Sequence, residues 1–93
     1  MIKTFATTEA AAIFANKRVR RFDPKMLRVA QRKLALLNRI EQVEELRIPP
    51  GNRLEKLSGK RSGQWSIRIN DQWRICFEWR DGNVWNVEIV DYH

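Results

Sequence analysis

The spacing of apolar residues changes once along this chain, at Pro49-Pro50-Gly51. Before this point the apolar positions recur with a period of about 3.6 residues, as one buried face of an α-helix requires. After it, apolar and polar positions alternate, which is the pattern of a β-strand with one buried face. A proline pair followed by glycine ends a helix and begins a loop. We therefore expect helices in the first half of the chain and a sheet in the second.

The first half predicts two helices. Residues 7–17 include a run of three alanines, and Thr7 or Thr8 can cap the N-terminus of the helix. Asp23-Pro24, a capping carboxylate followed by proline, predicts the start of a second helix that continues to about residue 46. The apolar stripe of this helix is formed by Leu27, Ala30, Leu34 and Leu37, widened by Leu36, Ile40 and Val43. The opening residues 1–6 alternate weakly and are compatible with a short strand.

The second half predicts three strands joined by two tight turns. Alternation begins at Trp65, resumes after Asp71-Gln72, and resumes again after Asp81-Gly82, a strong hairpin signal. Such a meander has one apolar face, which the two helices can cover. We therefore predict the α+β class, with two N-terminal helices packed on an antiparallel sheet, in a single domain of residues 1–93.

The charge of the chain is strongly positive, with 18 Lys and Arg against 11 Asp and Glu and a net charge of +7. Residues 17–33 alone hold eight basic side chains and one acidic one. This stripe favours a nucleic acid partner, although solubility, an acidic protein or an anionic membrane surface would explain it too. The single cysteine excludes an internal disulfide, and neither a signal peptide nor a membrane span is evident. A reduced, cytoplasmic location without a membrane partner is expected.

The polar side of the predicted sheet is rich in arginine. If it is not simply solvated, it suits phosphate, because the planar guanidinium matches phosphate oxygens. Cys76 is expected to pack as a small residue, and one His with one Cys is no ligand set, so neither a metal nor a cofactor is expected. Residues predicted to contact nucleic acid are Lys56, Lys60, Arg61, Arg68 and Asn70, next to Arg74, Cys76, Glu78 and Arg80 in the same pattern.

The last three residues, Asp91-Tyr92-His93, follow directly after a strand pattern. They could simply fasten the strand end. Alternatively they perform acid–base chemistry on RNA, since Asp and His can transfer protons and Tyr can stack on a base, with arginine stabilising charge. Strict alternation places Asp91 and His93 in phase with Val87 and Ile89, and Tyr92 on the opposite side.

Three motifs resemble the HigB-type toxins of the RelE superfamily: L-x-x-L-x-G at 54–59, N-D-Q-W-R at 70–74, and the terminal D-Y-H. The resemblance extends over essentially the whole chain. It implies a metal-independent, ribosome-dependent endoribonuclease that cuts messenger RNA in the ribosomal A site. It also implies a neighbouring HigA-like helix-turn-helix antitoxin, whose complex with the toxin would bind DNA. By position, Asp91, Tyr92 and His93 correspond to the catalytic group of the family, and Arg74 to its phosphate-contacting arginine.

Glu55 departs from that family pattern, because some members have histidine at this position. Either Glu55 takes the acid–base role beside Lys56 and Arg53, or the site depends on the terminal residues alone and is slow. Two other functions stay open. One is a basic module that binds RNA, DNA or only an antitoxin without cutting. The other is a gyrase poison, against which the D-Y-H ending argues.

Overall fold

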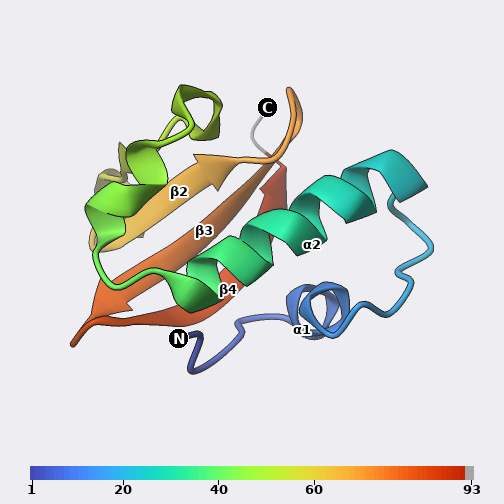
Figure 1. The fold of residues 1–93 in the computed structure, drawn as a ribbon, viewed down its shortest axis with the longest axis horizontal. Coiled ribbons are helices and arrows are strands. Elements are labelled where there is room, and N and C mark those ends of the chain that lie inside the picture. Colours follow the sequence, from blue (N-terminus) through green and yellow to red (C-terminus); the bar gives the residue numbers. More distant parts are fainter. Residues whose placement is uncertain (92–93) are drawn as a thin grey trace.

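The computed structural model describes residues 1–91 and shows two helices beside one antiparallel sheet (Figure 1). The strand order is β1-β2-β3-β4, and every neighbouring pair is antiparallel. The α+β class is thus confirmed. None of the helices in this part of the chain has the length and apolar character needed to cross a bilayer. The elements are α1 (Thr8–Phe14), α2 (Pro24–Arg39), β1 (Glu55–Lys56), β2 (Gln64–Arg68), β3 (Trp73–Arg80), β4 (Asn83–Asp91) and the 3-10 helices η1 (Val43–Arg47), η2 (Pro50–Asn52) and η3 (Gly59–Arg61).

Both predicted helix starts are confirmed by their caps. The Thr7 hydroxyl accepts a hydrogen bond from the Ala10 amide at 3.2 Å, and the Asp23 carboxylate accepts one from the Met26 amide at 2.8 Å. Pro24 is the first residue of α2, where its missing N–H is not needed.

The predicted end of the second helix is wrong, because α2 stops at Arg39 rather than near residue 46. The Glu45 carboxylate accepts hydrogen bonds from the backbone N–H groups of Glu41 and Gln42, both at 2.7 Å, and thereby starts the separate helix η1. This break turns the chain, yet Val43 and Leu46 remain buried. The apolar pattern therefore predicted burial correctly but could not reveal the change of direction.

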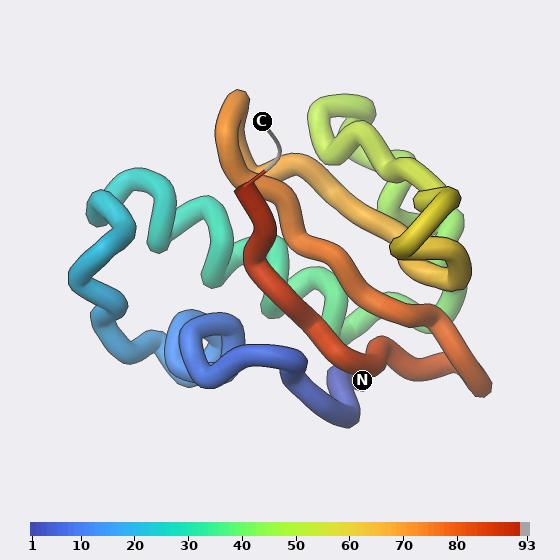
Figure 2. Tube along the Cα trace, turned by 180° about the vertical axis from the view of Figure 1, so that it is seen from behind, coloured from blue at the N-terminus to red at the C-terminus, as the bar shows by residue number. Residues whose placement is uncertain are grey.

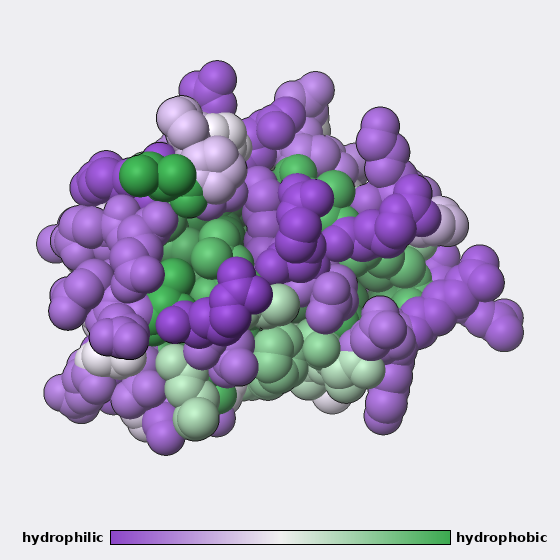
Figure 3. All heavy atoms as spheres, viewed as in Figure 1, coloured by the Kyte–Doolittle hydropathy of each residue, from purple (hydrophilic) through white to green (hydrophobic). Residues whose placement is uncertain are grey.

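The hydrophobic core lies between α2 and the sheet, which α2 crosses in Figure 1. Leu34 and Leu37 of α2 are fully buried in the same cluster as Ile75 and Phe77 of β3. Viewed from this side, the surface is largely hydrophilic, with apolar side chains visible between the polar ones (Figure 3).

The opening segment does not form the predicted strand. Ile2 and Phe5 make only isolated parallel bridges, to Val84 and Val87 of β4. Figure 2 shows this segment running beside the edge of β4.

The turn between β3 and β4 confirms the hairpin signal at Asp81-Gly82. Both residues have positive φ, 54° and 73°, as a two-residue hairpin turn requires. A bulge follows at Asn86, also with positive φ, because two residues of β4 stand opposite one of β3. Beyond the bulge, Asp91 pairs with Trp73 and is in phase with Ile89, as the alternation predicted.

Candidate active site on the outer face of the sheet

The sheet face turned away from α2, here called the outer face, carries Ser66, Arg74 and Cys76. Ser66 and Cys76 are register partners on β2 and β3, and Arg74 is two residues before Cys76. Their exposed fractions are 0%, 5% and 0%. The sequence allowed this face to be simply exposed to solvent. At Ser66, Arg74 and Cys76 that interpretation is wrong, because all three are buried.

The outer face is closed by residues 53–61, here called the cover segment. Its β1 residues pair with β2, so that Glu55 is opposite Ser66, a short strand that the sequence did not predict. The Arg61 guanidinium then contacts the Glu88 carboxylate of β4 at 3.2 Å. Because β3 separates β2 from β4, this ion pair shows that the cover segment crosses the face above Cys76.

Arg74 is the buried charged residue between the outer face and the cover segment. Its Nε donates to the Ser66 hydroxyl at 2.9 Å, and its Nη2 donates to the Ser66 carbonyl at 3.3 Å and to the Arg53 carbonyl. The Glu55 carboxylate lies 4.0 Å from Nη2. A buried guanidinium stays protonated at every physiological pH, so Arg74 places a permanent positive charge beside Glu55.

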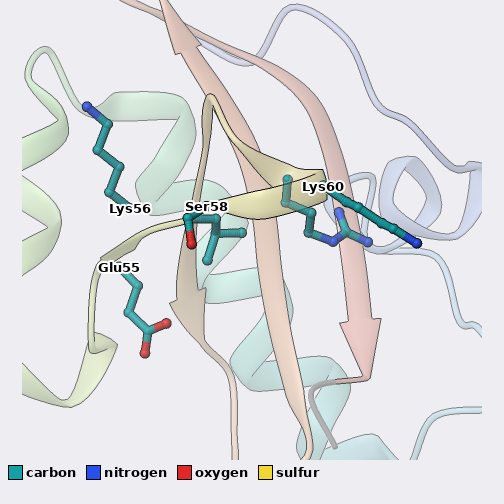
Figure 4. Close-up of a pocket in the computed structure, with 6 residues that line it drawn as sticks. Glu55, Lys56, Ser58 and Lys60 are labelled. Carbon is teal, nitrogen blue, oxygen red and sulfur yellow. The ribbon is translucent and has the colours of Figure 1, made fainter.

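Glu55 lies at the margin of a hollow of about 330 Å³, which the cover segment forms alone. Its carboxylate points away from the Lys56 ammonium, as expected for adjacent strand residues, while Lys60 extends along the far side (Figure 4). The lining residues are Glu55, Lys56, Leu57, Ser58, Lys60 and Arg61. Arg61 is paired with Glu88. Lys56 and Lys60 against Glu55 therefore leave the hollow with a positive balance that attracts anions.

The five residues predicted to contact nucleic acid fall into two groups. Lys56, Lys60 and Arg61 line the hollow, with the Lys56 ammonium also 5.6 Å from the centre of the Trp65 ring. Arg68 instead forms an ion pair with Asp71 in the turn after β2.

Asn70 closes that same turn. Its side-chain oxygen accepts hydrogen bonds from the backbone amides of Gln72 and Trp73 at 2.9 and 2.8 Å. The sequence pattern thus grouped residues that the structure separates into a basic hollow and a structural turn.

Asp91 is the last residue of β4. Its neighbour Val90 is the register partner of Arg74, so the backbone passes directly beside the arginine. Alternation places the Asp91 side chain on the face of Ile89, and its carboxylate accepts a hydrogen bond from the side-chain amide of Gln72 (Nε2) at 3.1 Å. Tyr92 and His93 lie outside the described residues. The structure therefore brings Glu55 and Arg74 together on the outer face, whereas the Asp91 side chain lies on the opposite face at the end of β4.

Cys76 is packed, as expected, and burial raises the pKa of its thiol. Among residues 1–91, the Cys, Asp and Glu side chains form no group of three or more that could hold a metal ion. The basic stripe of residues 17–33 lies on α2 and the segment before it, across the sheet from the hollow.

Comparison with known proteins identifies the family. The family model for the HigB-like toxin, described as the RelE-like toxin of type II toxin-antitoxin system HigB, matches residues 3–93. The chain belongs to this family.

Individual relatives extend this result. Toxin HigB-1 of Vibrio cholerae serotype O1 is 49% identical over 55 residues, which are 59% of this HigB-like chain and 58% of that protein. Endoribonuclease HigB of Proteus vulgaris is 39% identical over 41 residues, 44% of this chain and 45% of that protein. These matches span about half the length of each relative.

Solved structures show the same fold. A chain of the YoeB-YefM complex from Staphylococcus aureus superposes with a TM-score of 0.63 at 18% identity, covering 100% of this chain and 98% of that one. At this identity the similarity supports the fold alone.

Proposed function

We propose that this protein is the toxin of a type II toxin–antitoxin pair and cleaves translated messenger RNA in the ribosomal A site. The family match supports the toxin role, and the name of the Proteus vulgaris relative supports ribonuclease activity. The observation that carries the proposal is the Arg74–Glu55 pair. A buried, oriented cation lies within 4.0 Å of a carboxylate that borders a basic hollow.

The proposed reaction is attack of a ribose 2′-hydroxyl on the adjacent phosphorus. The 2′-oxygen–phosphorus bond forms and the phosphorus–5′-oxygen bond breaks, leaving a 2′,3′-cyclic phosphate and a 5′-hydroxyl. One group takes the 2′-hydroxyl proton and another gives a proton to the departing 5′-oxygen. Arg74 stabilises the negative charge that develops on the phosphoryl oxygens, so the scheme assigns this role to a side chain rather than to a metal.

Proton transfer is assigned to Glu55 together with the terminal residues Asp91 and His93, with Tyr92 against a base. Glu55 is supported by its place beside Arg74. The role of Asp91 rests on the resemblance, because alternation along β4 places its side chain with Ile89, on the face opposite to Arg74. The roles of Tyr92 and His93 rest on the resemblance of the D-Y-H ending.

RNA would be guided to this site by Lys56, Lys60 and Arg61, whose charges attract the phosphate backbone. Such contacts do not depend on sequence, so the choice of cleavage position is left to the ribosome, which presents the codon. The reaction takes place where translation does, in the cytoplasm.

The partner would be a HigA-like helix-turn-helix antitoxin that neutralises the toxin and binds DNA as the complex. Family membership supports an antitoxin, and the YoeB-YefM neighbour is itself a toxin–antitoxin complex. The basic stripe on α2 offers a separate surface for acidic side chains, away from the hollow.

The test is expression of the wild-type chain and of His93→Gln in cells, with messenger RNA 5′ ends mapped at single-nucleotide resolution. We expect new ends within codons of translated messages for the wild type and far fewer for the variant. Purified message incubated without ribosomes serves as the control and should stay intact. Growth arrest with unchanged 5′ ends would contradict the nuclease and favour a basic module that binds without cutting.

A further inference from the structure

The burial of Arg74 raises the question of what holds it. A charged group that loses its water must gain hydrogen bonds or it destabilises the fold. Arg74 is 5% exposed, and within residues 1–91 it donates to the hydroxyl and carbonyl of Ser66 and to the carbonyl of Arg53. These contacts engage Nε and Nη2, which form the side edge of the planar guanidinium.

The occupied edge fixes the direction of the group. Three hydrogen bonds to Ser66 and Arg53 hold this side edge and so orient the plane of the guanidinium. The end edge of the guanidinium is formed by Nη1 and Nη2. This edge is next to Glu55, whose carboxylate is 4.0 Å from Nη2.

Arg53 contributes its backbone rather than its side chain, which is exposed. Its φ and ψ of 45° and 57° are left-handed, a conformation that costs about 1 kcal/mol for a residue other than glycine. Such strain persists where the surroundings impose it. Here the Arg53 amide donates to the Pro50 carbonyl at 3.0 Å, and its own carbonyl accepts from Arg74.

We propose that Ser66 and Arg53 are positioning residues that hold Arg74 in the orientation needed to bind the scissile phosphate. This proposal rests on the proposed function. The buried Ser66 and the strained backbone of Arg53 thus act through Arg74, without contacting RNA themselves. The serine hydroxyl accepts from Nε, and the left-handed turn directs a carbonyl to Nη2.

The first test replaces the serine. Ser66→Ala removes the Nε acceptor and keeps the carbonyl, whereas Ser66→Thr keeps both. On stalled ribosomes with saturating toxin, we expect the cleavage rate constant of Ser66→Ala to fall on the order of 10-fold, with Ser66→Thr within about 3-fold of the wild type. The toxin concentration at half-saturation should not change, because the binding residues of the hollow are intact.

The second test separates the Arg53 backbone from its side chain. Arg53→Gly loses the charge but accepts positive φ, whereas Arg53→Val disfavours it strongly. We expect Arg53→Gly to cleave at nearly the wild-type rate and Arg53→Val to lose several-fold. Similar losses in both variants would show that the side-chain charge matters and would overturn the backbone role.

An NMR readout follows the orientation without relying on cleavage. The Nε–H signal of Arg74 should exchange slowly with water in the wild type and in Ser66→Thr, and faster in Ser66→Ala. Equal exchange and an equal cleavage rate in Ser66→Ala would overturn the proposal while leaving the ribonuclease intact. Absence of cleavage by the wild type would remove the proposed function, and the positioning role with it.

Discussion

Two buried cations bind carbonyl groups of the same strand from opposite faces of the sheet. Arg74 reaches Ser66 from the outer face, and Lys33 of α2 donates to the carbonyl of Arg68, two residues further along β2. Their exposed fractions are similar, 5% and 9%. They differ in their surroundings, since Glu55 accompanies Arg74. For Lys33, burial and then the positive charges of neighbouring arginines lower the pKa.

This difference separates a functional cation from a structural one. Arginine keeps its charge when buried, so it suits a position that must neutralise a phosphate. Lysine responds to burial by releasing its proton more readily, so its charge is not secured at this position. Lys33 instead ties α2 to the end of β2. Exchanging or removing the two side chains should therefore have very different consequences.

The largest effect is expected from Arg74→Lys. A lysine ammonium cannot reach Ser66, the Arg53 carbonyl and a phosphate together, so cleavage on the ribosome should fall by about 100- to 1,000-fold. The rate constant of single-turnover cleavage measures this loss. Arg80→Lys is the matched control, because Arg80 is exposed and stacks 4.5 Å from the Trp85 ring. A lysine variant at position 74 with wild-type activity would contradict the difference between the two cations.

Glu55→Gln should have the next largest effect. The amide keeps the shape of the side chain but cannot accept or return a proton, so the cleavage rate should fall about 100-fold. Thermal unfolding should change little, because the Arg74–Glu55 pair is partly exposed. Glu44→Gln, at an exposed carboxylate on η1, provides the control. Undiminished cleavage by Glu55→Gln would leave proton transfer to the terminal residues alone.

Much of the fold followed from the sequence, and the exceptions have physical causes. Caps and the Asp81-Gly82 turn are local, so their residues determine them. The end of α2 was not predicted, because the Glu45 side chain accepts hydrogen bonds from the backbone amides of Glu41 and Gln42. The spacing of apolar residues contains no information about such a contact. The bulge at Asn86 was missed for a similar reason, since Thr4 of a distant segment accepts from its amide at 2.8 Å.

The candidate site was predictable in its residue types but not in its burial. Motif resemblance pointed to Arg74 and to the terminal group, which stays a prediction, and charge pointed to the cations that line the hollow. Alternation placed Ser66 on the polar side without revealing that the cover segment would bury it. The cover segment is held by contacts such as Arg61–Glu88, which joins residues 27 positions apart in the chain. Ser66 and the Arg53 carbonyl therefore became visible only in three dimensions.

A smaller effect is expected from Lys33→Met, in stability rather than in cleavage. Because the folded state lowers the Lys33 pKa, the unfolded chain binds more protons between that value and 10.5, and this residue contributes more stability as pH rises through this range. Urea unfolding between pH 7 and pH 10 should show the free energy of unfolding of the wild type rising relative to that of Lys33→Met. Cys76, whose pKa is raised in the folded state, lowers stability as pH rises above 9.0. Both proteins contain Cys76, so this contribution cancels in the difference between them. A pH-independent difference would contradict the lowered pKa.

The smallest effect concerns the closure of the outer face. Cys76 is buried beneath the cover segment and its pKa is raised, so iodoacetamide should modify it only when the segment opens or the chain unfolds. Arg61→Gln removes the ion pair to Glu88, which is partly exposed and contributes at most about 1 kcal/mol. Alkylation of this variant at pH 8 should therefore accelerate by no more than about 5-fold, as followed by mass spectrometry. Lys60→Gln, which keeps that ion pair, should react like the wild type. Equal rates in all three proteins would mean that Cys76 reacts through opening of the whole sheet, and that Arg61 holds RNA rather than the cover.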